Sequence, residues 1–524
     1  MARRSREGLT PQRRALLAAI ARREWLLQML ALAAAGCGQV KDRAYARGNT
    51  VIVAVPGDGG YLNPTPWFDD PLWLAFLPLM AMNDKVEWEG RLAERWEHSS
   101  DYREWTYYLR PGVRWHVGVP VTAHDVKFSL ELWSKVGEFP PGSVLESIAV
   151  LDDYTLRVRH RDVQDYQWME IPYPKHLLEG LDPERFYDWD FWKRPVGNGP
   201  YRFVRYQPQT MMEFEANPDY YRSKPKIERV LLKFVGQAGL ADLLAGDVDA
   251  LSRVNPVWIP SLAADSRFHV YYSETPDYYA AIMWQHRHPL FRDARVRRAL
   301  TLAIDRHELL QLLHLPKEAP LTDGPVTWRQ FLRRELAEPL PHDPMQAREL
   351  LEAAGWHDPT GGGVREREGL AFQFTALTSG AYQQMATYVQ AQLRRVGVDM
   401  AVQMDPAARA KIKSGEFPEA AFDKQQGLSP FDYTRANSLG YQNARVVELV
   451  NRVHVTADPD VQDGIYSELR KIFREEVPVT YLVPQLRTAV AHQRIRGLGG
   501  PWQTDPLKFM EDLWLDNRAS RSTT

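Results

Sequence analysis

Cysteine is almost missing from this chain of 524 residues, in which Cys37 is the only one. A single thiol cannot form an intrachain disulfide, so no such bridge stabilises the fold. Long apolar runs are missing too. The stretch over residues 25–35 has eleven mostly apolar residues, which are too few to span a bilayer. We therefore expect a protein whose body is not embedded in a membrane.

A strong excess of one charge is also missing, because the net charge is −2. Residues 1–36 hold seven Arg and two Glu, so the rest of the chain carries about −7. A mildly acidic body is unsuited to nucleic acid, and we expect no such partner. With 44% hydrophobic residues and a mean hydropathy of −0.43, the chain has the composition of a soluble globular protein. It is too long for one simple domain.

Familiar catalytic patterns are absent as well. The sequence contains no G-x-S-x-G, no Walker loop and no H-E-x-x-H. His307-Glu308 begins like a zinc-protease helix, but Gln311 stands where the second histidine ligand would be. A triad assembled from distant residues stays open in principle, although nothing in the sequence argues for one. We therefore predict that the protein is not an enzyme.

Two further patterns are weak candidates for ligand sites. Gly197 and Gly199 lack the third glycine and the following helix of a phosphate-binding loop, which favours a turn. His286-Arg287-His288 could touch a metal or a chelate, but neighbouring loop histidines are usually only solvated. We expect neither a metal nor a cofactor.

The amino terminus has the layout of an export signal over residues 1–36. Arg22 and Arg23 precede the short apolar stretch, which ends in small residues. The paired arginines resemble a twin-arginine export signal, with an ordinary basic segment as the alternative. Cys37 follows Ala34-Ala35-Gly36, which resembles the site where bacterial lipoproteins are cleaved and acylated. The sequence thus predicts a lipid anchor at Cys37.

The stretch from residue 92 to residue 131 has the clearest local pattern. Trp105, Tyr107 and Leu109 recur at every second position, which predicts a half-buried strand. Pro111-Gly112 predicts a turn. Thr122, followed three residues later by Asp125, predicts the capped start of a helix.

Other segments predict ordinary elements. Residues 49–55 predict a buried strand, and residues 143–159 predict a hairpin that turns at Asp152-Asp153. Val296, Leu300 and Ile304 predict one face of a helix.

Several motifs together resemble one known family. LRPGVRWHVGVPVTAHDVKFSLE, residues 109–131, resembles the signature of the extracytoplasmic solute-binding proteins of peptide-type ABC importers. Other signatures of that family follow in order along the chain: GNGPYRF at 197–203, NPDYY at 217–221, LLAGDVDAL at 243–251, PLFRDARVRRAL at 289–300 and DPMQARELLEAAGW at 343–356.

This resemblance implies an α/β fold, the two-lobed periplasmic-binding-protein fold of type II in its peptide-binding cluster. Lobe one would be discontinuous, over residues 48–68, 195–270 and 489–520. An extra subdomain of lobe one would span 69–194, and lobe two would span 271–488.

The resemblance also implies an interlobe ligand site, although two anchors of its peptide binders are missing. Pro418 replaces a usual aspartate, and the following loop reads Lys424-Gln425-Gln426-Gly427 rather than acidic. No arginine follows the strand that matches residues 372–377. A neutral polar solute such as a sugar or glycoconjugate is therefore an alternative to a peptide.

We expect the loop from Asp423 to Tyr433 to contact the ligand. The full set of predicted ligand-binding residues is Tyr61, Asn63, Trp67, Trp284, Gln285, His286, Gln425, Gln426, Asp432 and Tyr433.

The implied function is that of a substrate-binding component of an ABC importer. Its partners would be a peptide or other small solute, the importer's membrane permease subunits, and a membrane surface reached through the lipid anchor. We expect a monomer in the periplasm or outside the cytoplasmic membrane. An exported hydrolase and a solute sensor without a transport role remain the alternatives.

Replacement of Cys37 by Ala tests the predicted anchor. Without the thiol no acyl chain can be attached, so the variant should move from the membrane fraction to the soluble fraction. Cell fractionation and immunoblotting measure this, with Ser99→Ala as a matched control that should stay with the membrane. A Cys37→Ala variant that remains membrane-bound contradicts anchoring at this residue.

Overall fold

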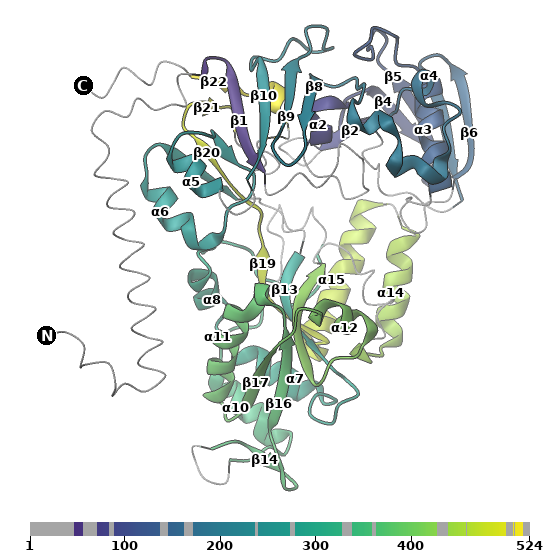
Figure 1. The fold of residues 1–524 in the computed structure, drawn as a ribbon. Coiled ribbons are helices and arrows are strands. Elements are labelled where there is room, and N and C mark those ends of the chain that lie inside the picture. The colour runs from purple at the N-terminus through teal and green to yellow at the C-terminus, as the bar shows by residue number, and fades with distance from the viewer. Residues whose placement is uncertain are drawn as a thin grey trace, which may run out of the picture.

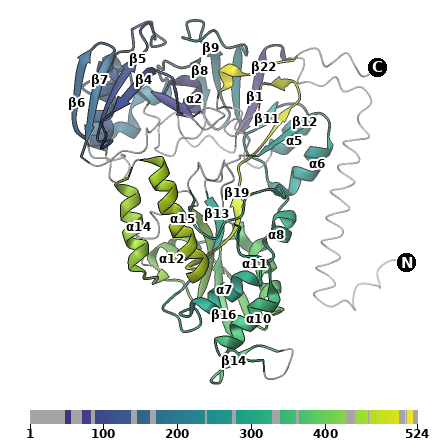
Figure 2. The ribbon, with the colours of Figure 1, turned by 180° about the vertical axis from the view of Figure 1, so that it is seen from behind.

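The computed structural model shows two lobes stacked one above the other (Figure 1). Figure 2 shows the same two lobes from behind. It describes residues 47–55, 71–82, 88–136, 145–161, 171–235, 239–272, 278–326, 338–358, 363–426, 439–456, 458–498, 507 and 509–516. A mixed α/β architecture is confirmed, with a large sheet in each lobe and smaller sheets beside them.

The upper lobe contains a seven-stranded sheet, in the order β12-β20-β11-β1-β10-β9-β8. Its strands are β1 (Thr50–Val55), β8 (Tyr201–Gln207), β9 (Met211–Ala216), β10 (Arg229–Phe234), β11 (Ala250–Leu251), β12 (Phe268–Tyr272) and β20 (Thr488–His492). The strand expected over residues 49–55 is confirmed as β1, which pairs in parallel with β10 and β11. Val51 and Val53 belong to one hydrophobic cluster and Ala54 to another, because both faces of the sheet are covered.

A four-stranded antiparallel sheet, β4-β5-β7-β6, lies beside this lobe. Its elements are β4 (Ala93–His98), β5 (Glu104–Leu109), β6 (Leu145–Asp152) and β7 (Thr155–His160), with the helix α3 (Ala123–Val136) packed against β6. The predicted strand, hairpin and helix are confirmed, although the hairpin turns at Asp153-Tyr154, one residue later than predicted. The backbone N–H of Thr122 donates to Asp125 Oδ2 (2.8 Å), which is one half of the expected cap.

Gly197 and Gly199 join this subdomain to the large sheet. An added Cβ at Gly197 would lie 1.8 Å from the carbonyl oxygen of Ala75. Between the two glycines, Asn198 Oδ1 accepts from the backbone N–H of Leu77 (2.8 Å). These glycines therefore serve a close backbone approach, and a bend and then strand β8 follow them rather than the helix of a phosphate-binding loop.

The lower lobe contains a five-stranded sheet, in the order β17-β16-β18-β13-β19. Its strands are β13 (Tyr278–Trp284), β16 (Gln373–Thr378), β17 (Asp399–Met404), β18 (Ala420–Gln426) and β19 (Val479–Gln485). Its helices are α7 (Ala294–Leu302), α8 (Arg306–Leu312), α10 (Pro344–Ala353), α11 (Gln383–Arg394), α12 (Ala408–Ser414), α14 (Ala444–His454) and α15 (Pro459–Glu476).

The helix face predicted from Val296, Leu300 and Ile304 is confirmed as buried, although α7 ends at Leu302 and Ile304 lies just beyond it. Shorter elements complete the described part of the chain: α2 (Pro71–Ala75), β2 (Met80–Met82), β3 (Trp88–Gly90), α4 (Lys175–Leu178), η2 (Pro183–Asp188), η3 (Asp190–Lys193), α5 (Gly239–Leu244), η4 (Pro256–Trp258), α6 (Ile259–Ala264), β14 (Glu366–Arg367), β15 (Leu370–Ala371), η5 (Gly380–Tyr382), β21 (Ile495–Arg496), η7 (Met510–Asp512) and β22 (Trp514–Leu515).

The chain passes between the two large sheets twice. It leaves the upper sheet at the end of β12 and enters the lower sheet at β13, and it returns from β19 to β20. β12 pairs antiparallel with β20, and β13 pairs antiparallel with β19. The two crossings therefore start and end on neighbouring strands, and the one from β19 to β20 can be followed in Figure 1.

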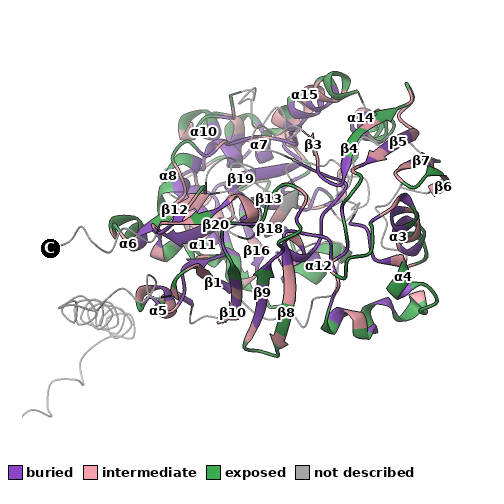
Figure 3. Cartoon of the chain, turned by 90° about the horizontal axis from the view of Figure 1, so that it is seen from above, coloured by how far each residue is buried: buried purple, intermediate pink, exposed green. Residues whose placement is uncertain are grey.

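The central strands of the two large sheets are mostly buried, whereas the outer helix faces and the edge strand β8 carry exposed residues, as Figure 3 shows from above. Separate hydrophobic clusters fill the upper lobe and the two faces of the lower sheet. Among the helices that the structure describes, none combines the length and the apolar composition needed to cross a membrane.

One buried carboxylate ties the upper sheet together. Asp249, just before β11, pairs with Arg494 (Nε to Oδ1, 2.8 Å), and both side chains are completely buried. Arg47 Nη2 contacts the same oxygen (2.6 Å), and the backbone N–H of Ile52 donates to Asp249 Oδ2 (2.7 Å). Arg494 also donates to the carbonyl oxygens of Gly48 and Thr50. Segments from the start, middle and end of the chain thus meet at one ion pair.

Substitution of Asp249 by Asn should destabilise the protein by about 3–5 kcal/mol, because it leaves Arg494 buried without its countercharge. The measurement is urea unfolding at neutral pH. Asp190→Asn removes a carboxylate of the exposed Asp190–Lys193 pair and is the matched control, with an expected change below about 0.5 kcal/mol. Equal effects of the two substitutions would show that Asp249 is not a structural centre.

Candidate functional site

In the lower sheet, the strands that follow β16 in sequence are added on both sides of it, so the strand order reverses next to β16. From β16 the chain passes through α11 to β17 on one side, then through α12 to β18 on the other side. β17 and β18 both run parallel to β16. Residues of α11 pack in one hydrophobic cluster and residues of α12 in another, so the two helices cover opposite faces of the sheet. Ligands of open α/β sheets bind outside the carboxyl ends of the strands at such a point.

We call this place the switch edge. It comprises the segment after β16 (residues 378–382), the end of β18 (residues 423–426), Tyr278 at the start of β13 and Gln485 at the end of β19. Tyr278 lies opposite Gln426 on one side and Gln485 on the other. Because both crossings reach the lower sheet here, the switch edge is the end of this lobe that lies towards the upper lobe (Figure 1).

Polar and aromatic side chains gather on the face of the switch edge that α11 covers. Gln485 Nε2 donates to the phenolic oxygen of Tyr382 (3.0 Å), and Tyr382 is only 7% exposed. Lys424 Nζ lies 3.8 Å from the centre of the Tyr278 ring, which is a cation–π contact. Burial raises the pKa of Tyr382, and the nearby carboxylate of Asp423 adds to this effect, so the phenol is protonated at neutral pH.

Asp423 is half-buried on the opposite face of the sheet, which α12 covers. It pairs with Ala281, whereas Lys424 pairs with Ala280, and consecutive strand residues point to opposite faces. Burial raises the pKa of Asp423. Arg409, Lys424 and Lys413 oppose this rise because positive charge favours the ionised carboxylate.

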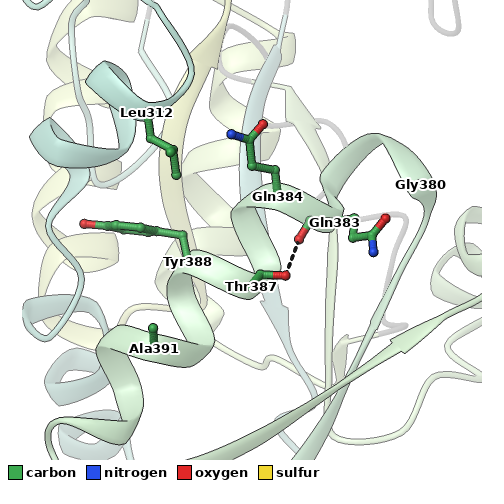
Figure 4. A pocket seen from close by; sticks show the side chains of 7 residues that line it. All are labelled: Leu312, Gly380, Gln383, Gln384, Thr387, Tyr388 and Ala391. Carbon is green, nitrogen blue, oxygen red and sulfur yellow. Dashed lines mark hydrogen bonds between the residues drawn. The ribbon is translucent and has the colours of Figure 1, made fainter. Parts of the chain in front are cut away.

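A groove of about 630 Å³ begins at the switch edge and follows α11, as Figure 4 shows. It is lined by Leu312, Gly380, Gln383, Gln384, Thr387, Tyr388 and Ala391. Below it, the Tyr388 hydroxyl donates to Glu308 Oε2 (2.7 Å), and Gln392 Nε2 donates to the same oxygen (3.1 Å). Glu308 therefore connects α8 to α11. In the His307-Glu308 pattern, which begins like a zinc-protease helix, the glutamate thus has a structural role.

Trp284, Gln285 and His286 lie at the other end of β13 from Tyr278, roughly 20 Å away for six residues of strand. All three are buried. Trp284 Nε1 donates to Thr480 Oγ1 (2.9 Å), and the His286 ring donates from Nε2 to the carbonyl of Pro478 (3.0 Å). The structure thus places them at the opposite end of β13 from the switch edge, and the ring N–H groups of Trp284 and His286 bond within the lower lobe.

Gln425 and Gln426 do lie at the switch edge, but the expectation of a loop from Asp423 onward is wrong. Residues 423–426 belong to β18, because their backbone pairs with β13 as far as the Gln426–Tyr278 position. Six further predictions fall outside the described residues, at Tyr61, Asn63, Trp67, Asp432, Tyr433 and the lipidation site Cys37.

Sequence reasoning did not select Tyr278, Tyr382 or Gln485 as site residues. They come from three separate segments that meet only through strand pairing. The β–α–β order from residue 373 to residue 426, with helices on alternating faces, is the signal that could have located their edge.

Among the residues that the structure describes, no three His, Cys, Asp or Glu side chains gather in a group that could hold a metal ion. His286 is held in the core, apart from any such group.

Comparison with known proteins places these features in context. A model of the bacterial extracellular solute-binding proteins, family 5 (middle region), matches residues 87–443. The oligopeptide-binding protein AppA of Bacillus subtilis is 26% identical over 435 residues, covering 77% of this chain and 79% of AppA. The structure of AppA with a nonapeptide superposes with a TM-score of 0.68 at 22% identity, covering 89% of this chain and 99% of that one. NikA of Brucella suis with Fe(III)-EDTA gives 0.73 at 19% identity, covering 89% and 100%.

The buried position of His286 predicts a loss of stability in acid. Burial lowers the pKa of His286 to about 4, and the positive charge of Arg297 acts in the same direction. An unfolded histidine titrates near 6.5, so between about pH 6.5 and 4 the unfolded chain holds more protons. The free energy of unfolding should therefore fall as the pH falls through this range, by up to about 1.4 kcal/mol per pH unit for this residue.

Urea unfolding of the wild type and of His286→Asn at pH 7 and pH 5 measures this effect. The variant should lose less stability between the two pH values, because it has no proton to gain at this site. An identical pH dependence of the two proteins contradicts a neutral, buried His286.

Proposed function

Because this chain belongs to the bacterial extracellular solute-binding proteins of family 5, we propose that it is the substrate-binding component of an ABC importer. It captures a peptide-like or other polar solute between its two lobes and delivers it to the membrane permease. The observation that carries this proposal is the pair of adjacent crossings between two large sheets. Such a connection lets two rigid bodies open and close about a few backbone positions.

The proposed ligand site is the switch edge of the lower lobe together with the facing surface of the upper lobe. Gln425 and Gln426 retain their predicted role as hydrogen-bonding groups, and Tyr61, Asn63, Trp67, Asp432 and Tyr433 retain theirs as ligand contacts. Trp284, Gln285 and His286 are left out, because they are buried at the far end of β13 from the switch edge.

We assign the lobes the bounds inferred from the sequence, with two adjustments supported by the strands. β12 extends to Tyr272 and β20 begins at Thr488. We therefore place the boundaries of lobe two after Tyr272 and before Thr488. The extra subdomain, over residues 69–194, contains the four-stranded sheet.

The cellular setting follows from the amino terminus and the family. We propose a monomer outside the cytoplasmic membrane, exported by a signal over residues 1–36 and held at the membrane surface by acylated Cys37. Closure around the solute shifts a pre-existing equilibrium between open and closed forms, and the permease subunits recognise the closed form. The role assigned to each residue is to bind rather than to react.

The test begins with the solute. We expect a small polar molecule to be released on denaturing protein purified from its native host, and mass spectrometry identifies it. Added back to solute-free protein, it should reduce the radius of gyration in small-angle X-ray scattering, because the lobes close. Prolonged incubation should return the solute unchanged.

Conversion of the solute into a product would contradict this proposal and favour an exported hydrolase. A bound solute that fails to stimulate ATP hydrolysis by the reconstituted permease would favour a sensor. Either result would contradict the importer function.

A further inference from the structure

One edge of the upper sheet points away from the lower lobe, and the direction of the strands identifies it. β12 ends where the chain leaves for the lower lobe, and the pairing through β20 and β11 makes it run in the same direction as β1 and β10. The starts of β1 and β10 therefore lie at the opposite edge, together with β21, which follows the end of β20. We call this the distal edge. It comprises Asn49, residues 222–228, Arg496, Gly497 and Trp514, and its strands β21 and β22 lie at the upper end of Figure 1.

We propose that the distal edge rests on the lipid surface to which the chain is anchored. Trp514 is the apolar contact, and Lys224 and Lys226 are the cations that meet lipid phosphate groups. The inference rests on the anchoring at Cys37 proposed above, and it adds which face of the body meets the membrane.

Trp514 is an aromatic side chain held at the surface. It is 43% exposed, and no other tryptophan in the described part of the chain is listed among the exposed large apolar side chains of the surface. Its indole lies against Gly497, where φ is +92° and an added Cβ would come within 2.9 Å of the ring. The Lys226 Nζ lies 5.0 Å from the ring centre. An indole that is packed on one side, exposed on the other and flanked by a lysine suits a membrane–water interface.

A short basic segment runs beside this indole. Residues 222–227 hold three cations and no carboxylate, and Arg222, Lys224 and Lys226 are all exposed. Lysine ammonium groups donate hydrogen bonds and attract phosphate as compact positive charges. Each lysine or arginine near an anionic lipid surface favours binding by roughly fivefold.

Carboxylates at the distal edge limit this attraction. Asp512 pairs with Arg222 (3.3 Å), and Asp516 lies 3.8 Å from Arg496. Glu228 is also exposed, which lowers the net positive charge further. Charge alone would therefore give a weak contact, and the contact depends on the indole and the two lysines together.

The start of the described chain lies at the same place. Asn49 Nδ2 donates to the carbonyl oxygen of Lys226 (2.6 Å). Ten residues lead from Cys37 to Arg47, and at full extension they reach at most about 35 Å. Acylation of Cys37 thus keeps the distal edge close to the lipid, and such a tether makes even a weak contact effective. The lower lobe then points away from the membrane, where lipid does not obstruct its closure.

The experiment uses the acylated protein in mixed vesicles of phosphatidylcholine and phosphatidylglycerol. Because Cys37 is the only cysteine and acylation blocks its thiol, one added cysteine takes a fluorescent dye at one place. Ser223→Cys labels the distal edge, and Ser414→Cys labels the exposed end of α12 in the lower lobe as the control. A lipid with a spin label in its headgroup quenches a dye that lies at the membrane surface.

We expect the dye at residue 223 to be quenched and the dye at residue 414 to stay bright. In the Ser223→Cys protein, Trp514→Ala should lower the ratio of membrane-contacting to free orientations roughly five- to tenfold. Lys226→Met should lower it roughly fivefold, and less at high salt. Lys413→Met removes an exposed lysine of α12 and should leave the ratio unchanged. Thermal unfolding verifies that each variant is folded.

Three results would overturn the inference. Equal quenching at residues 223 and 414, or quenching that Trp514→Ala leaves unchanged, contradicts the membrane contact while the anchor and the solute-binding function stand. Shielding of residue 223 only after permease subunits are added would assign the distal edge to a protein partner instead. Protein that does not attach to the vesicles contradicts both the anchor and this contact, whereas solute binding measured in solution would still stand.

Discussion

The Asp249–Arg494 ion pair is the interaction on which the upper lobe depends. In the upper sheet, β20 is separated in sequence from the other strands by the whole lower lobe. A single contact that joins these distant segments therefore holds the discontinuous sheet together. The completely buried carboxylate provides it, because Asp249 binds Arg494, Arg47 and the backbone N–H of Ile52. Because this charge is removed from water, loss of one of these partners would leave it less well compensated and would cost stability.

In the lower lobe, polar side chains are carried by the ends of a paired sheet. Its sheet is covered on both faces, so the ends of the strands are where polar side chains can reach a ligand. At the switch edge, Tyr278 is fixed between two partner strands and Tyr382 is fixed by Gln485. These contacts fix the positions of Tyr278 and Tyr382 relative to the lower sheet.

Local elements could be predicted from the sequence because their causes are local. Trp105, Tyr107 and Leu109 alternate in burial along one strand, and the cap at Thr122 needs only Asp125 three residues later. The family, and with it the two-lobed fold, was predictable from motifs alone. The candidate site was predicted only in part. The pairing that extends β18 to Gln426 and the hydrogen bond that places Trp284 in the core both involve residues far away in sequence.

The adjacent crossings have a consequence for how such a molecule can be assembled and altered. From Tyr278 to Gln485 the lower lobe is one uninterrupted segment, and its first and last strands pair side by side. Its two ends therefore meet at one place on its surface, as do the ends of a domain inserted into a host protein. The upper lobe acts as that host: its sheet closes across the insertion through the pairing of β12 with β20. Either body can thus acquire substitutions without changing the topology of the other, so that ligand chemistry on one side can diverge while the opposite side is retained.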